Sequence, residues 1–140
     1  MTLIITVDEC FGLAFGGRRQ SRDRELTRDA VRLACGRRII AKEYSRPLFE
    51  EAGEDTKNVI FADEPTRVAE KDDVVLLELG VSAEDLFGAD ELVVYNWNRR
   101  YPATSRLDTE LVERDFIPVK TLEFKGNSHE KLTRVEYTRK

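Results

Sequence analysis

Short runs of consecutive hydrophobic residues recur along the first hundred positions, each bounded by charged residues or glycine. They predict β-strands over residues 1–7, 38–42, 58–62, 73–78 and 91–97. Runs that are continuous rather than alternating are typical of strands covered on both faces of a largely parallel sheet. We expect one residue of each strand to lie at the centre of the sheet: Ile5, Ile39, Ile60, Leu76 and Val93.

A helical period appears once at length, after the first strand. Leu26, Ala30, Val31 and Ala34 recur at helical spacing, so a principal helix is expected from Ser21, as its N-cap, to Ala34. Two brief helices are expected over residues 45–52 and 82–87. Residues 116–124 and 131–139 partly alternate between apolar and polar positions on either side of Gly126-Asn127, which predicts a C-terminal antiparallel hairpin.

These elements predict one α/β domain over residues 1–140, with a central mixed sheet of six to eight strands. No linker or internal repeat divides the chain. No apolar run approaches the roughly 20 residues of a membrane span, and we expect a cytoplasmic protein. Cys10 and Cys35 have no metal-ligand or disulfide spacing, and no metal site is expected.

Charge is distributed unevenly along the chain. The net charge is −4 and the pI is about 5.2, which argues against general nucleic-acid binding and leaves only a local basic pocket. Eight arginines, against three acids, lie between Gly16 and Ile39. Guanidinium groups match phosphate and carboxylate geometry, so Arg18, Arg19, Gln20 and Arg22 are candidate contacts for a small anionic ligand. The alternative is a solvated loop whose arginines pair with the neighbouring acids.

Two further clusters carry candidate chemistry. Trp97, Asn98 and Arg99 leave the fifth strand at the carboxyl edge of the sheet, where ligands of such sheets bind; Trp97 could instead pack against the hairpin. His129, the only histidine, can carry a proton near neutrality. Its neighbour Glu130 cannot be assumed to orient it, and a surface turn is the alternative. The sequence reveals no Ser-His-Asp order and no metal-ligand group.

The order of elements resembles the dihydrofolate reductase-like fold. The likeness is carried by LIITVDECFGLAF, RELTRDAVRLACGRRIIAKEYSRPLFEEA, NVIFADEP, VVLLELGVSAEDLFGADELVVY and the ending from FIPVKTLEF to VEYTRK. This resemblance implies the family's topology in a trimmed form, because residues 65–73 are too few for its additional helix. It also implies that Glu25 corresponds to the acid that the family carries on its substrate helix.

The cofactor motifs of the reductases are missing. The family's glycines after the fourth strand, which admit the cofactor pyrophosphate, are replaced here by Leu77-Glu78-Leu79-Gly80. The family's segment that holds the 2′-phosphate end of the cofactor is replaced here by Ala41-Lys42-Glu43-Tyr44, so no cofactor is expected. The chain is also similar to a group of small bacterial proteins of unassigned function, through the segments GGRRQSRD, YNWNRRYP and FKGNSHEK.

Three functions follow from these observations. The first is binding of a phosphorylated or nucleotide-like anion through the arginine-rich loop, with Asn98 and Arg99 as further contacts. The second is an enzyme that acts on phosphate esters or RNA, with His129 as a candidate catalytic residue; Glu25 is a candidate catalytic residue through the resemblance to the reductases. The third is a divergent NADPH-dependent reductase. The sequence leaves homo-oligomer formation open.

Overall fold

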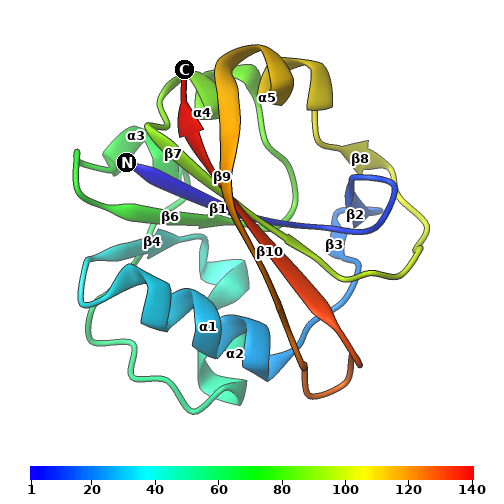
Figure 1. The fold of residues 1–140 in the computed structure, drawn as a ribbon. Helices are drawn as coiled ribbons and strands as arrows, with labels where there is room; N and C mark the ends of the chain where they lie inside the picture. The colour runs from blue at the N-terminus through cyan, green and yellow to red at the C-terminus, as the bar shows by residue number, and fades with distance from the viewer.

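The structure, a computed structural model, describes residues 1–140 and is built on a seven-stranded sheet (Figure 1). Its strands, in the order of the sheet, are β5 (Val59–Phe61), β4 (Ile39–Ala41), β6 (Val74–Leu77), β1 (Thr2–Val7), β7 (Glu91–Asn96), β10 (Leu132–Arg139) and β9 (Phe116–Phe124). The first five run parallel, and β10 pairs antiparallel with both β7 and β9. The mixed sheet and the C-terminal hairpin are confirmed.

Helices cover both faces of this sheet, as the continuous hydrophobic runs predict. Figure 1 shows them in two layers, with α1 (Arg24–Ala34) and α2 (Arg46–Glu51) on one side and α4 (Ala83–Phe87) and α5 (Thr109–Asp115) on the other. Alternate residues of β1 therefore enter different cores: Ile4 packs with Leu26 and Ala30 of α1, whereas Leu3 and Ile5 pack with Leu86 and Val112. Single turns at η1 (Glu43–Ser45) and α3 (Pro65–Val68) complete the helical elements.

The structure corrects several predictions of detail. Ile60 is not central: β5 is the edge strand, and this side chain is 39% exposed. The principal helix begins two residues later than predicted, with Asp23 and not Ser21 as its N-cap. The segment after the first strand, which was not predicted to form strands, pairs with residues 105–106 in a second, three-stranded sheet of β2 (Gly12–Phe15), β3 (Arg18–Arg19) and β8 (Ser105–Arg106). The helix α5 was not predicted.

A buried polar cluster fixes α1 against the sheet. The Tyr95 hydroxyl and Arg134 Nη1 each donate to Asp29 Oδ2 over 2.6 Å, which ties the helix to β7 and β10. Burial and the neighbouring Asp29 carboxylate raise the pKa of Tyr95, so the phenol stays protonated as a donor.

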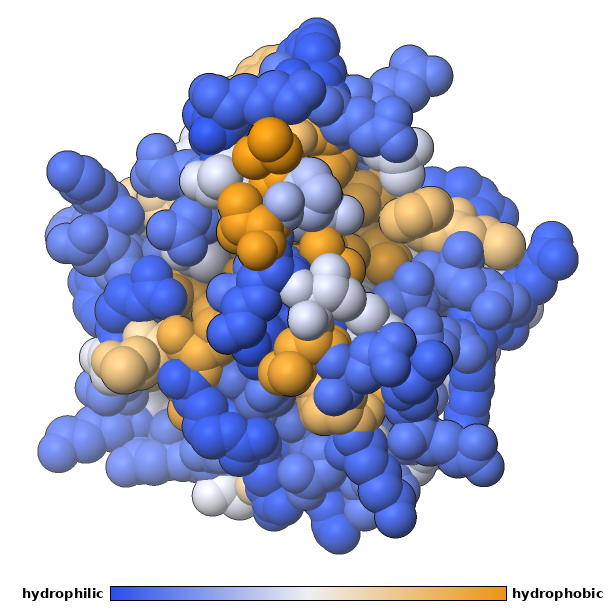
Figure 2. Space-filling view, viewed as in Figure 1, coloured by the Kyte–Doolittle hydropathy of each residue, from blue (hydrophilic) through white to orange (hydrophobic).

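The outer face of the hairpin is partly apolar. Figure 2 shows hydrophobic atoms down the middle of the face across which β9 runs in Figure 1, and polar side chains around them. Ile117, Val119 and Leu122 of β9 are among the exposed large hydrophobic side chains. None of the helices is long and apolar enough to cross a membrane.

Candidate functional site

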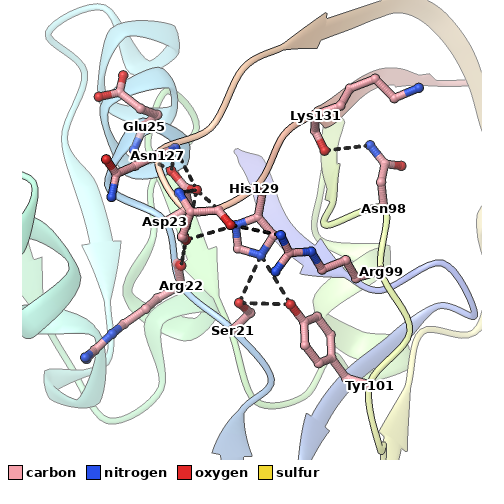
Figure 3. A network of polar contacts seen from close by, with 11 residues as sticks. Ser21, Arg22, Asp23, Glu25, Asn98, Arg99, Tyr101, Asn127, His129 and Lys131 are labelled. Atoms are coloured by element: carbon pink, nitrogen blue, oxygen red, sulfur yellow. Dashed lines mark hydrogen bonds and ion pairs between the residues drawn. The ribbon is translucent and has the colours of Figure 1, made fainter.

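The candidate site lies where parallel strands end. Asp8 directly follows β1, Glu78 follows β6 and Trp97 follows β7, and the parallel pairing of these strands brings the three residues to one edge of the sheet. The first turn of α1 and the turn between β9 and β10 meet at this edge (Figure 3). The carboxyl edge is where sheets of this kind bind ligands.

Asp23 is the residue that joins these segments. As the N-cap of α1, its Oδ1 accepts from the Glu25 N–H over 2.9 Å. The same buried carboxylate accepts from the backbone N–H groups of Asn127 and Ser128, in each case over 2.9 Å. One side chain therefore caps the helix and anchors the hairpin turn, although the two lie more than a hundred residues apart in the sequence.

The turn can approach Asp23 this closely because residue 126 is glycine. A Cβ at Gly126 would lie 2.6 Å from Asp23 Oδ2 and 2.8 Å from the His129 carbonyl oxygen. Both separations are too short for real contacts, so any larger residue would force the turn away from the carboxylate. The absence of a side chain at this position thus allows the turn to pack closely around Asp23.

The carboxylate of Asp23 stays charged despite its burial. Burial works to raise its pKa, but the hydrogen bonds from Asn127, His129, Ser128 and Glu25 outweigh it and lower the pKa from 3.8 to about 2. An ionised carboxylate only accepts hydrogen bonds. At neutral pH, each group that faces Asp23 must therefore donate to it.

This requirement fixes the tautomer of His129. Its Nδ1 lies 2.9 Å from Asp23 Oδ2, so Nδ1 carries the proton and, in the neutral ring, Nε2 is left as an acceptor. The ring is 3% exposed and stacks on the buried Trp97 indole, with 4.9 Å between ring centroids. His129 is therefore a buried and oriented side chain, and the interpretation as a surface-turn histidine is wrong.

Two hydroxyl groups face the free nitrogen of His129. Nε2 lies 3.1 Å from Ser21 Oγ and 3.2 Å from the Tyr101 hydroxyl, and the Tyr101 hydroxyl is 3.3 Å from Ser21 Oγ (Figure 3). Every group has a partner when Tyr101 donates to Ser21, Ser21 donates to His129 Nε2, and His129 Nδ1 donates to Asp23. We call these four side chains the hydroxyl–imidazole–carboxylate relay.

A Ser-His-Asp arrangement is thus present, although the sequence did not reveal one. Ser21 and Asp23 are two residues apart, whereas His129 comes from the other end of the chain. Only the meeting of the α1 start with the hairpin turn aligns them. The group that orients His129 is Asp23 and not its sequence neighbour Glu130.

The Arg19 side chain is held by contacts with other residues of the protein. Its guanidinium contacts Glu78 through Nε at 2.8 Å and Nη2 at 3.1 Å, and lies over the Tyr44 ring at 4.2 Å. Ser45 Oγ also donates to Glu78, over 2.6 Å. Because Glu78 is buried and bound bidentately, Arg19 has little freedom to leave it for a ligand.

Arg22 and Arg99 are held far more loosely. Arg22 pairs with Glu51 at 2.8 Å, but its side chain is 57% exposed and that of Glu51 is 44% exposed. Such a surface ion pair contributes little. The exposed Arg99 donates through Nη2 to the Ser128 carbonyl, over 2.9 Å, and pairs with no acid. These two guanidinium groups, from the two segments that flank His129, remain able to meet an anion.

The other predicted residues have structural partners or lie apart from the relay. Gln20 Nε2 donates to Asp8 and to the Pro102 carbonyl, and Asn98 Nδ2 donates to the Lys131 carbonyl and to Thr133 Oγ1. Arg18 is exposed on the β2–β3 hairpin. Glu25 pairs with Arg28 at 2.8 Å, and Figure 3 shows its side chain directed away from His129.

Two kinds of space adjoin the relay. Ser21 lines a narrow pocket with Leu26, Leu48, Glu78 and Trp97, and the volume of this pocket is about 10 Å³. Arg22 and Asp23 also line an open polar depression of about 250 Å³. The side chains that complete it are Arg24, Glu51, Asn127 and Ser128. Of the relay, only Asp23 lines this depression, and the narrow pocket beside Ser21 has room for about one water.

A separate, larger cleft of about 400 Å³ opens beside the start of α4. Its charged side chains are Asp63, Glu64, Glu84 and Asp85 against Lys42 and Arg67. The N-terminus of α4 is closed by a capping box, in which Ser82 N donates to Asp85 Oδ2 and Asp85 N donates to Ser82 Oγ. Nowhere in the structure do three or more His, Cys, Asp or Glu side chains gather in a way that could hold a metal ion.

Comparison with known proteins identifies the architecture. No family model matches the sequence, and no curated protein matches it. Among solved structures, the chain is similar to dihydrofolate reductase from Enterococcus faecalis in complex with NADP(H) and RAB-propyl, with a TM-score of 0.63 and 14% identity. The match covers 99% of this chain and 95% of that one.

The residues present do not fit the NADP(H) that this neighbour holds. Only Gly80 remains of the glycines that admit a pyrophosphate, and the capping box occupies the N–H groups of Ser82 and Asp85 at the start of α4. Four carboxylates against two cations line the cleft, which opposes a polyanion. At 14% identity the likeness concerns architecture alone: the chain has the dihydrofolate reductase-like fold, without the residues for that cofactor.

Proposed function

We propose that this protein is an enzyme that acts on a small phosphate ester, with His129 as its proton carrier. The observation that carries this proposal is the position of His129 Nε2, which faces the Ser21 hydroxyl at 3.1 Å while Asp23 holds the opposite nitrogen at 2.9 Å. A histidine with one nitrogen fixed by a carboxylate and the other free to accept a proton is equipped for general acid–base catalysis.

The positive charges of two exposed arginines favour an anionic substrate. Arg22 precedes Asp23 in the chain, and Arg99 donates to the carbonyl of Ser128, the neighbour of His129; neither guanidinium is bound by a buried acid. Guanidinium groups bind phosphate oxygens and stabilise the charge that develops on them during transfer. The ligand predicted from the arginine-rich loop is retained in this proposal, but its contacts are Arg22 and Arg99, since Glu78 occupies Arg19.

The first test is hydrolysis of chromogenic phosphate monoesters and diesters, together with a short RNA, by the wild-type protein and His129→Gln. We expect loss of activity of about 10²-fold or more in the variant. Far-ultraviolet circular dichroism would show whether the variant remains folded. Equal rates in the folded variant and the wild type, or no hydrolysis by the wild type, would refute this function.

The second test concerns the anion contacts. Phosphate and nucleoside monophosphates should raise the melting temperature of the wild type, and Arg22→Ala with Arg99→Ala should remove that increase. Arg32→Ala is the matched control, because Arg32 is exposed in the last turn of α1, the helix that follows Arg22, and pairs with no acid. An equal response in the double variant and in the control would show that the two arginines do not bind the anion.

A further inference from the structure

We propose that Ser21 is the nucleophile of this reaction, so that turnover passes through a phosphoserine at that position. This inference rests on the proposed function and makes it more specific. It adds a covalent step and a constraint on the leaving group. The evidence is the linear order of contacts: Ser21 Oγ to His129 Nε2 at 3.1 Å, and His129 Nδ1 to Asp23 Oδ2 at 2.9 Å.

The arrangement meets the requirements of an activated hydroxyl. A serine is weakly nucleophilic until an adjacent base removes its proton, and that base must itself be oriented by a third group. Asp23 is ionised and fully buried, so it can stabilise the imidazolium that forms when His129 takes the proton. The stacked indole of Trp97, at 4.9 Å, holds the ring in this plane.

Ser21 suits this role better than the second hydroxyl. Tyr101 can donate to Ser21 Oγ over 3.3 Å, which leaves Ser21 to donate to the imidazole. In that order Ser21 loses its proton to His129, and Tyr101 then stabilises the charge on the serine oxygen. Ser21 is also the neighbour of Arg22 in the chain, and both residues line the narrow pocket beside Trp97.

The geometry of phosphoryl transfer decides what His129 can do. The attacking and leaving oxygens lie roughly in line on opposite sides of the phosphorus, so a base beside Ser21 cannot reach the leaving group. In the first step the Ser21 Oγ–P bond forms, His129 takes the serine proton, and the bond from phosphorus to the leaving oxygen breaks. The leaving group must depart as an anion and take its proton from water.

The second step returns the enzyme to its starting state. Water attacks the phosphorus from the side that the leaving group vacated, and the Ser21 Oγ–P bond breaks. His129 returns its proton to Ser21, and the proton of the attacking water passes to solvent. One water is consumed for each ester cleaved. Aryl phosphate esters, whose leaving groups are stable anions, are therefore the expected substrate class.

A covalent label tests the nucleophile independently of turnover. A fluorophosphonate phosphonylates an activated serine and releases fluoride, which needs no proton from the enzyme. We expect the intact protein to gain one phosphonyl group, located on Ser21 by peptide mass spectrometry. Ser21→Ala should not be labelled, and Asp23→Asn should be labelled at least about tenfold more slowly. Thr121→Ala, which removes an exposed hydroxyl on β9, is the control and should label like the wild type.

The outcomes separate the two proposals. Absence of label on Ser21 in the folded wild type, or label on Tyr101 in its place, would overturn the inference. Hydrolysis of p-nitrophenyl phosphate by Ser21→Ala at the wild-type rate, with His129→Gln inactive, would also overturn it and leave the proposed function intact. Labelling of Ser21 without hydrolysis of any phosphate ester would support the nucleophile and refute the proposed substrate class.

Discussion

Asp23→Asn is the substitution that best tests the relay as a charged network. Both oxygens of Asp23 accept from backbone N–H groups, since Glu25 donates to Oδ1 and Ser128 donates to Oδ2, each over 2.9 Å. Whichever way an asparagine amide turns, its NH₂ faces a donor. One buried donor is then left unpaired, at a cost of about 1–3 kcal/mol.

The lost charge adds a second contribution that depends on pH. The pKa of Asp23 falls from 3.8 to about 2 on folding, and each unit corresponds to about 1.4 kcal/mol, so the charge contributes about 2 kcal/mol at neutral pH. Because the folded pKa is the lower one, this contribution is complete well above 3.8 and disappears as the pH falls through about 2. We expect Asp23→Asn to lower the free energy of unfolding by about 3–5 kcal/mol in total at pH 7.

Urea unfolding followed by the fluorescence of Trp97, the single tryptophan, would measure both contributions. The difference in the free energy of unfolding between wild type and variant should shrink by about 1 kcal/mol at about pH 3, where about half of the charge contribution is gone. Asp72→Asn is the control, because Asp72 is exposed and in no ion pair, and it should cost under about 0.5 kcal/mol. A difference that is the same at both pH values would refute the role assigned to the charge.

Three further predictions concern residues around the relay. Arg19→Met should lower the free energy of unfolding by about 3–5 kcal/mol, because it leaves the Glu78 carboxylate buried without its partner. Adding Glu78→Leu should restore most of this stability, as measured by urea unfolding of the two single variants and the double variant. Gly126→Ala should cost about 1–3 kcal/mol in the same assay and slow phosphate-ester hydrolysis, whereas Gly80→Ala, where a Cβ meets nothing within 4 Å, should do neither. NADPH fluorescence should not change on titration with the protein, because acids outnumber basic side chains four to two in the cleft beside α4; saturable binding would contradict this interpretation.

The sequence predicted the elements whose signals are local. The β1, β6 and β7 strands are continuous apolar runs, and α1 has a clear helical period, so each was found within a few residues of its bounds. The burial of Ile60 was wrong because an apolar run does not reveal whether its strand lies at the centre or at the edge of a sheet. The strands β3 and β8 were missed because two residues carry no periodicity.

The site was only partly predictable for a related reason. The sequence drew attention to all the segments that meet around His129, since each combines unusual charge with glycine or an aromatic residue. It could not indicate that Asp23, and not Glu130, orients the histidine, because that contact joins residues 106 positions apart. The signal that was available is the pair Asp23 and Glu25 at the start of an apolar helical period, which is typical of an N-cap and would have placed Asp23 correctly.

The distribution of the arginines explains how this fold could support a different chemistry at the same edge of its sheet. Arg19 occupies the buried Glu78 at the end of β6, the strand after which the reductases have their glycines. The α1 start and the hairpin turn, by contrast, line an open polar depression. Arg22 lines this depression, Arg99 donates to the Ser128 carbonyl of the hairpin turn, and the free nitrogen of His129 faces Ser21. If Arg19 secures the structure while the exposed arginines bind the ligand, Arg19→Met should change stability far more than anion affinity, and Arg22→Ala should do the reverse.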